Sequence, residues 1–307
     1  MSTHGWAMMA RAVSSGALAC LLTVALGGGC SVDKETQITV ALSSETEIPK
    51  ELDSFSVHVI STRTGELRFS QDYFPTSGRE FPTTLAVIPL DQSSIGSPLR
   101  IELEGRKQGA TFLRRVSVIS YFEGRNILLT MPLRMACFQF RDCGPSATCA
   151  GGQCVPTEVS PASLADYDAK LVFPSGAEGS CFDEETCLDA PVAIQIEPDC
   201  TFSLPAAGAT RGNVSIRWAA AAERILALDE SDAQEGWVRL SSLRGRLSQG
   251  ACDSHFGRLG ADGKPLVADS ARTVYFSAAC PSKTARLPYC YSAVTQHAGV
   301  GAVRPAP

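Results

Sequence analysis

The chain has 307 residues and a formal net charge of −5, from 27 basic and 32 acidic side chains. That length suffices for two domains of ordinary size. Because the acidic excess is spread along the chain and the basic residues do not gather into one surface, nucleic acid is not expected as a partner. Three local basic clusters are each predicted to be a solvated strand edge or loop: Arg106-Lys107, Arg114-Arg115 and Arg244-Gly245-Arg246.

Residues 1–29 have the organisation of an export signal. Arg11 is the only charged side chain before an apolar run at residues 17–26, which suits the positive leading region of a secretory signal. The run has about ten residues, half of the roughly twenty that a helix needs to span a bilayer. A cleaved segment is therefore expected rather than an anchor helix.

The signal ends in Leu26-Gly27-Gly28-Gly29-Cys30, which resembles the lipobox of bacterial lipoproteins, with Gly27 where that motif normally has Leu. The resemblance implies cleavage before Cys30, acylation of that cysteine with palmitate and related chains, and membrane lipid as a partner. Ser31 is not the Asp associated with inner-membrane retention in this family, so the resemblance implies an outer-membrane anchor, facing the periplasm or the outside. Two alternatives stay open: cleavage before Cys20, and ordinary signal cleavage that leaves Cys30 an unmodified thiol.

Residues 30–36 would form a lipidated tether, and residues 37–134 show strand patterning. Short alternating runs recur, such as residues 38–42 and 55–59, and Thr64-Gly65 and Glu123-Gly124 are expected to be hairpin turns. About seven strands in a hundred residues, without a long amphipathic helix, predict a two-sheet sandwich like the immunoglobulin or fibronectin III class. Since no cysteine lies between Ser31 and Ala136, apolar packing alone must hold this domain together.

Residues 135–156 differ in composition from the preceding strands, with four cysteines in eighteen residues and glycines at the turns. The run Cys137-x5-Cys143-Gly144-x4-Cys149-Ala150-Gly151-Gly152-Gln153-Cys154 resembles the compact half of an epidermal-growth-factor-like module, a segment too small to bury a core. The alternative to disulfides is a zinc site formed by the four thiolates. Zinc ligands usually come as closer-spaced cysteine pairs, so disulfides are expected. Residues 157–170 have no strong hydrophobic period and are predicted to be a linker.

A second domain is predicted over residues 171–295, followed by a disordered tail at residues 296–307. Its expected strands are residues 192–196, 214–218, 225–228, 237–240 and 273–276. Residues 219–224 favour helix by propensity, although a connection between strands is preferred. The fold is therefore expected to be mostly β: a sandwich, a small disulfide-rich connector and a disulfide-stabilised β-rich domain.

Ten cysteines remain when Cys20 and Cys30 are set aside, and ten is an even number. In a chain routed to an oxidising compartment, such a set is expected to form up to five disulfides, whose connectivity the sequence leaves open. The ten are Cys137, Cys143, Cys149, Cys154, Cys181, Cys187, Cys200, Cys252, Cys280 and Cys290.

No motif in the sequence predicts an enzyme. After signal cleavage three histidines remain, and only His255 has acidic and hydroxyl neighbours, Asp253 and Ser254. Neighbours in sequence seldom converge as a catalytic triad, so this cluster is predicted to be a loop beside a disulfide. An exported hydrolase that uses Asp253 and His255 is the alternative.

No metal or cofactor is expected either. The sequence contains no His-Glu-x-x-His, Walker or dinucleotide-binding motif. The acidic runs at residues 183–185 and 229–236 lack the alternating oxygen ligands of an EF-hand loop, and each is predicted to be a solvated turn rather than a calcium site.

The candidate ligand-binding residues are aromatic: Trp237, Tyr289 and Tyr291. Sugars and peptides pack on exposed rings, and Tyr289 and Tyr291, which flank Cys290, are expected to be exposed. Together with the lipobox resemblance, these residues predict a non-enzymatic cell-envelope lipoprotein with a binding or scaffolding role, its partner an envelope glycan or protein. A purely structural envelope protein is a further alternative.

Overall fold

The computed structural model describes residues 35–75, 81–138, 143–173, 181–206, 210–218, 224–257, 273–287 and 289. The chain divides into two units, Met1–Lys34 and Glu35–Pro307, and all described residues belong to the second. The predicted signal, most of the tether, residues 219–223 and the predicted tail lie outside the described residues. The fold is mostly β, as expected, and the described α-helices are short: α1 (Ala169–Val172), α2 (Glu184–Cys187) and α3 (Gln249–Phe256).

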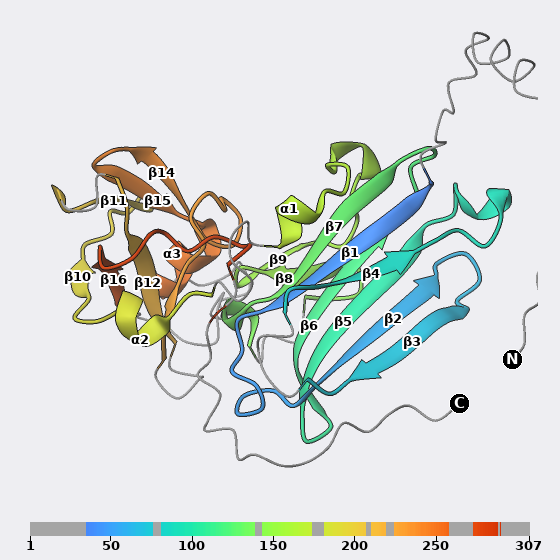
Figure 1. The fold of residues 1–307 in the computed structure, drawn as a ribbon, viewed down its shortest axis with the longest axis horizontal. Helices are drawn as coiled ribbons and strands as arrows, with labels where there is room; N and C mark the ends of the chain where they lie inside the picture. The colour runs from blue at the N-terminus through green and yellow to red at the C-terminus, as the bar shows by residue number, and fades with distance from the viewer. Residues whose placement is uncertain are drawn as a thin grey trace, which may run out of the picture. The chain divides into compact units, whose positions relative to one another are not determined.

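Residues 37–133 build two sheets (Figure 1). In the first, the central strand β1 is antiparallel to β4 and parallel to β7. The second is antiparallel throughout, in the order β3-β2-β5-β6. The strands are β1 (Gln37–Ser44), β2 (Ser54–Ser61), β3 (Leu67–Tyr73), β4 (Thr83–Val87), β5 (Leu99–Lys107), β6 (Ala110–Ile119) and β7 (Asn126–Leu133).

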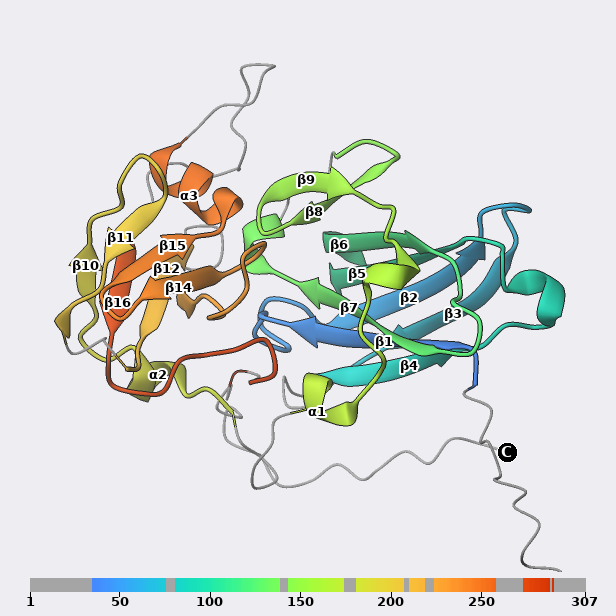
Figure 2. The same ribbon diagram turned by 90° about the horizontal axis from the view of Figure 1, so that it is seen from above.

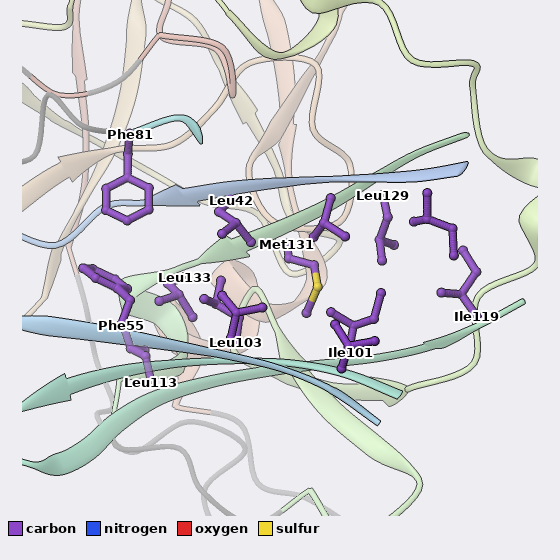
Figure 3. Packing of buried hydrophobic residues seen from close by; sticks show 14 of the residues in the cluster. Leu42, Phe55, Phe81, Ile101, Leu103, Leu113, Ile119, Leu129, Met131 and Leu133 are labelled. Carbon is purple, nitrogen blue, oxygen red and sulfur yellow. The ribbon is translucent and has the colours of Figure 1, made fainter. Parts of the chain in front are cut away.

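The two sheets enclose one apolar core. Figure 3 shows side chains of both sheets meeting in a single layer, with Leu42 and Met131 from one sheet and Ile101 and Leu103 from the other. These four side chains are at most 3 % exposed. The apolar face expected for residues 55–59 is buried in the same core. Alternating strand residues therefore supply the packing that holds this part of the chain together.

The turns between these strands differ in part from those expected. Thr64-Gly65 is a hairpin turn between β2 and β3, as predicted, with Gly65 at φ 70°. The prediction for Glu123-Gly124 is wrong, because this turn carries the chain from β6 to β7 in the opposite sheet. A hairpin turn that was not predicted joins β5 to β6 at Gln108-Gly109, where both residues have positive φ, as a two-residue type I′ turn requires.

The cysteine-rich segment contains a small hairpin of β8 (Ala147–Ala150) and β9 (Gln153–Pro156), which Figure 2 shows from above. Two disulfides hold it, Cys137–Cys149 and Cys143–Cys154. Pairing lies within the first four cysteines, one of the arrangements that the sequence left open.

Residues 157–170, predicted as a linker, run along one side of the two sheets. The Val118 amide donates to Thr157 O at 2.7 Å, and the Leu128 amide donates to Ala165 O at 2.9 Å. Val118 lies in β6 and Leu128 in β7, which are the edge strands of the two sheets on this side. The segment thus satisfies backbone groups that an uncovered edge would leave to solvent.

The C-terminal part contains two further sheets, with strand orders β10-β16-β12-β13 and β11-β15-β14. All five predicted strands are present within two residues of their expected bounds, while β11 and β15 were not predicted. The strands are β10 (Val192–Ile194), β11 (Thr201–Ser203), β12 (Asn213–Trp218), β13 (Arg224–Ala227), β14 (Trp237–Ser241), β15 (Arg244–Leu247) and β16 (Val274–Ser277).

Disulfides also cross-link this part. Cys187 pairs with Cys280 and Cys200 with Cys252, across 93 and 52 residues. Cys181 is disulfide-bonded as well, and Cys290 lies outside the described residues. Cys252 belongs to α3, so the prediction of a loop around Asp253 and His255 is wrong.

Candidate functional site

The aromatic residues predicted to bind a ligand are core residues instead. Trp237 is 0 % and Tyr289 2 % exposed, and their rings pack against Phe202 and Phe182 at centroid distances of 5.8 and 5.6 Å. The Tyr289 hydroxyl donates to Ala227 O at 2.8 Å. The expected exposure of Tyr289 is therefore wrong, because short strands need large rings to fill the space between them. Tyr291 lies outside the described residues.

The Asp253 and His255 region does not assemble a catalytic pair. Asp253 is buried, and its carboxylate accepts from the side-chain amides of Gln153 and Gln249, both at 2.7 Å. Positions two apart on a helix point in different directions, and the His255 ring lies against Phe256 at 4.8 Å. The geometry thus gives Asp253 a role in joining α3 to the β9 residue Gln153, and it does not favour the hydrolase alternative.

A buried ion network surrounds Arg134, the residue after β7. Its guanidinium contacts four carboxylates: Glu45 at 2.8 Å, Asp229 at 2.7 Å, Glu235 at 3.1 Å and Asp232 at 3.4 Å. Burial lowers the pKa of Arg134, but these carboxylates outweigh burial and raise that pKa well above its usual value. Arg134 therefore stays charged while it holds residues distant in sequence together.

Two further cations complete the network. The ammonium group of Lys283 lies 2.5 Å from Asp229, and Arg115 pairs with Glu235. Burial raises the pKa of the Asp229 carboxyl, but Lys283 and Arg134 lower it by more, so that it falls below its usual value. The turn predicted at residues 229–236 is present, but it is not solvated throughout, because Asp229 and Glu235 are buried. The prediction of a solvated edge at Arg115 is wrong. The counter-ions of these residues come from far along the chain, which a local pattern does not reveal.

One feature that offers space to a ligand is a groove on the side of the sandwich opposite residues 157–170. Among the described residues, β3 pairs only with β2 and β4 only with β1, so both sheets end at this side. A cavity of about 190 Å³ opens between these two edge strands. Its lining comprises Val59, Ser61, Arg63, Arg68, Phe69, Leu85, Ala86, Val87, Ile88, Leu90, Ser94, Ser97, Leu99 and Tyr121.

The groove combines an apolar lining with two arginines and no carboxylate. Tyr121 is 7 % exposed, and burial raises its pKa to about 12 although Arg68 opposes the shift. Arg68 pairs with Glu66 at 3.2 Å, whereas Arg63 has no ion-pair partner among the described residues. The site can therefore take an apolar group and offers a guanidinium to an anionic one.

At one end of the sandwich, the groove residues Ile88 and Leu90 are joined by further exposed apolar side chains. We call four of them the rim: Leu67, Ile88, Leu90 and Phe122, which are 54, 61, 72 and 37 % exposed. The register places them together, because β3 begins, β4 ends and the β6–β7 turn lies at the end where β1 begins. The Gln37 amide donates to Arg125 O at 3.0 Å and the Gly124 amide to Thr36 Oγ1 at 2.9 Å, which ties the chain entry to this end.

Sequence reasoning missed the groove, although one signal was present. The apolar pattern of Leu85 and Val87 continues through Ile88 and Leu90, beyond the last residue of β4. Apolar residues that continue beyond the end of a strand are candidates for an exposed apolar surface. Arg63 carries no such signal, because its position depends on the β2–β3 turn.

Comparison with known proteins gives no match: no family model, curated protein or solved structure resembles this chain significantly. Within the described residues, no helix is long and apolar enough to cross a bilayer. The described residues also contain no group of three or more His, Cys, Asp or Glu side chains placed to hold a metal ion.

Proposed function

We propose that this chain is an exported cell-envelope lipoprotein, anchored through acylated Cys30, with a non-enzymatic binding role. Residues 26–30 supply the acylation motif, and the disulfides that the structure describes are of the kind that persists in an oxidising compartment. Acylation would supply membrane affinity, since several acyl chains bind a bilayer stably where one binds marginally.

The groove between β3 and β4 is the observation that carries the binding role. Its volume of about 190 Å³ exceeds the roughly 150 Å³ at which a dry apolar cavity accepts benzene. Eight of its fourteen lining residues are apolar and none carries a carboxylate, so an aromatic ring or alkyl group next to an anionic group fits better than a glycan. We therefore propose as ligand an apolar group next to an anionic one, carried by an envelope protein or lipid.

The anchor is tested by the intact mass of the membrane-extracted protein, with and without reduction. We expect the mass of residues 30–307 plus acyl chains, and an increase on reduction by two protons for each disulfide. The Cys30→Ser variant should lose the acyl mass. A chain that begins elsewhere and carries no lipid would contradict the anchor.

The groove is tested with the fluorophore 1-anilinonaphthalene-8-sulfonate, which carries an apolar ring system and an anionic group. Val87→Phe places a ring in the groove and should lower the affinity at least about tenfold, because it removes the space for the ligand. The matched control is Val192→Phe on β10, where Val192 is 54 % exposed and outside the groove. Equal affinity in the two variants would contradict this site.

A further inference from the structure

We propose that the rim residues Leu67, Ile88, Leu90 and Phe122 rest in the surface of the lipid bilayer. This inference rests on the proposed acyl anchor at Cys30, and it assigns the rim a partner, the lipid bilayer. The sandwich would then be a docked domain with one end in the membrane interface, rather than a domain that hangs from its tether.

The first argument is the exposure of the rim. Scattered apolar side chains are ordinary on protein surfaces, but here four of them lie at one end of one sandwich. They border a groove that is itself apolar, so the exposed apolar surface continues into the cavity. Such a surface gains from removal from water when it enters the boundary between headgroups and acyl chains.

The second argument is the length of chain between the anchor and the sandwich. Only residues 31–36 separate Cys30 from Gln37, and seven residue steps reach at most about 25 Å. The β1 strand begins at the rim end and carries the chain away from it, so its last residue, Ser44, lies roughly 23 Å farther along. Of the two ends of the sandwich, the rim end is therefore the one that the tether holds closest to the membrane.

The third argument concerns charge. Arg63 and Arg68 border the groove and can donate to lipid phosphates. Glu66, Asp91 and Glu123 lie at the same end, so the net charge there does not favour an anionic surface by itself. Apolar burial is thus the main attraction, with Arg63, which has no ion-pair partner among the described residues, positioned for a headgroup.

The test uses the acylated full-length protein in vesicles of phosphatidylglycerol and phosphatidylethanolamine that contain brominated acyl chains. Bromine quenches tryptophan fluorescence only at short range, so an added tryptophan reports insertion. Leu90→Trp places the reporter on the rim. Phe74→Trp is the matched control, because Phe74 is 73 % exposed, like Leu90 at 72 %, but follows β3 at the opposite end of the same sandwich.

We expect the vesicles to quench about half or more of the emission added by Leu90→Trp, and little of that added by Phe74→Trp, since interfacial side chains reach roughly 5–10 Å into the bilayer. Ile88→Trp should behave like Leu90→Trp, which guards against a local defect at one position. Equal quenching at positions 90 and 74, or none at position 90, would overturn the docking. Cross-linking at position 90 to a second copy or to another protein, without quenching, would overturn it too.

Sedimentation of the same samples separates this proposal from the anchor. Protein that sediments with the vesicles but shows no quenching at position 90 is anchored and not docked, which refutes this inference alone. Protein that stays in the supernatant refutes the anchor and, with it, the premise of the docking.

Discussion

The sandwich and the C-terminal part of this chain are both β-rich, but different interactions stabilise them. The sandwich strands are 5–10 residues long and enclose a continuous apolar core, with no cysteine between Ser31 and Ala136. The C-terminal strands are only 3–6 residues long, and disulfides and buried ion pairs accompany them. The C-terminal part nevertheless encloses an apolar core nearly as large as that of the sandwich. The comparison therefore shows that cross-links accompany short strands, which share few backbone hydrogen bonds, rather than a small core.

The largest expected effect is the loss of a long-range disulfide. The double variant Cys187→Ala/Cys280→Ala opens a loop of 93 residues and should lower the unfolding free energy of the C-terminal part by about 4 to 5 kcal/mol. The control, Cys143→Ala/Cys154→Ala, opens a loop of 11 residues and should cost about 3 kcal/mol. Denaturant unfolding followed by tryptophan fluorescence measures the effect, since Trp218 and Trp237, the two tryptophans after residue 30, lie in this part. An equal cost for the two pairs would contradict the loop-length argument.

A substitution that shortens a core side chain should destabilise the sandwich rather than the C-terminal part. Leu103 is 0 % exposed between the two sheets, so Leu103→Ala should lower the unfolding free energy by about 3 kcal/mol through lost burial and a residual cavity. Leu67→Ala, at a position 54 % exposed, should change it by less than about 0.5 kcal/mol. Hydrogen exchange resolved by segment provides the measurement. Faster exchange confined to residues 37–133 is expected, and equal acceleration in the C-terminal strands would contradict the comparison.

The two parts also differ in how far the sequence predicts them. The alternating runs of β1 and β2 are visible in the sequence because a strand with one buried face repeats every two residues. In β15 the same reasoning failed, since Arg244-Gly245-Arg246 is predicted to be a solvated strand edge or loop, whereas β15 is the central strand of its sheet. Gly245 is required there because the Phe202 ring occupies the space that a Cβ would need. That requirement arises from a residue more than forty positions away.

The helix α3 and the ion network were missed for related reasons. Gly250, Asp253 and Ser254 are weak helix formers, so the sequence carries no clear helix signal there, but the Cys200–Cys252 disulfide and the Gln153 contact stabilise the segment as a helix. Arg134 finds its carboxylates 89 to 101 residues away, as the pairs with Glu45 and Glu235 show. Local sequence patterns predict helices and strands. Ion pairs between residues far apart in the sequence become visible only in the structure.

The ion network offers a smaller test, in which two neighbouring aspartates should respond in opposite ways. The pKa of Asp229 is lowered in the folded protein, because Lys283 and Arg134 outweigh burial. Its carboxylate therefore stabilises the fold above pH about 4, and this contribution is lost as the pH falls through the lowered pKa. At neutral pH, Asp229→Asn should cost about 2 kcal/mol, as expected for a lost charged hydrogen bond.

The matched control is Asp232→Asn. Burial raises the pKa of Asp232 despite the attraction of Arg134, so its charged form is disfavoured by folding and removal of that charge should be neutral or stabilising at neutral pH. The amide keeps the side-chain oxygen that accepts from the Gln234 and Glu235 amides. Thermal unfolding of both variants between pH 3 and 7 measures the difference. Equal destabilisation would show that the network does not discriminate between these carboxylates.

The smallest expected effect is a raised pKa of Tyr121, which lines the groove of the sandwich. Burial raises the pKa of Tyr121 to about 12, so its phenol should ionise above the ordinary tyrosine value near 10, and the difference between the native protein and Tyr121→Phe isolates its phenolate absorbance. Because the folded pKa exceeds the unfolded value near 10, stability from the neutral phenol should decline as the pH rises from 10 to 12. A bound apolar group would exclude more water from Tyr121 and raise this pKa further. An ordinary pKa that a groove ligand leaves unchanged would mean that Tyr121 is solvated, and the groove would then lack the apolar interior on which the proposed ligand depends.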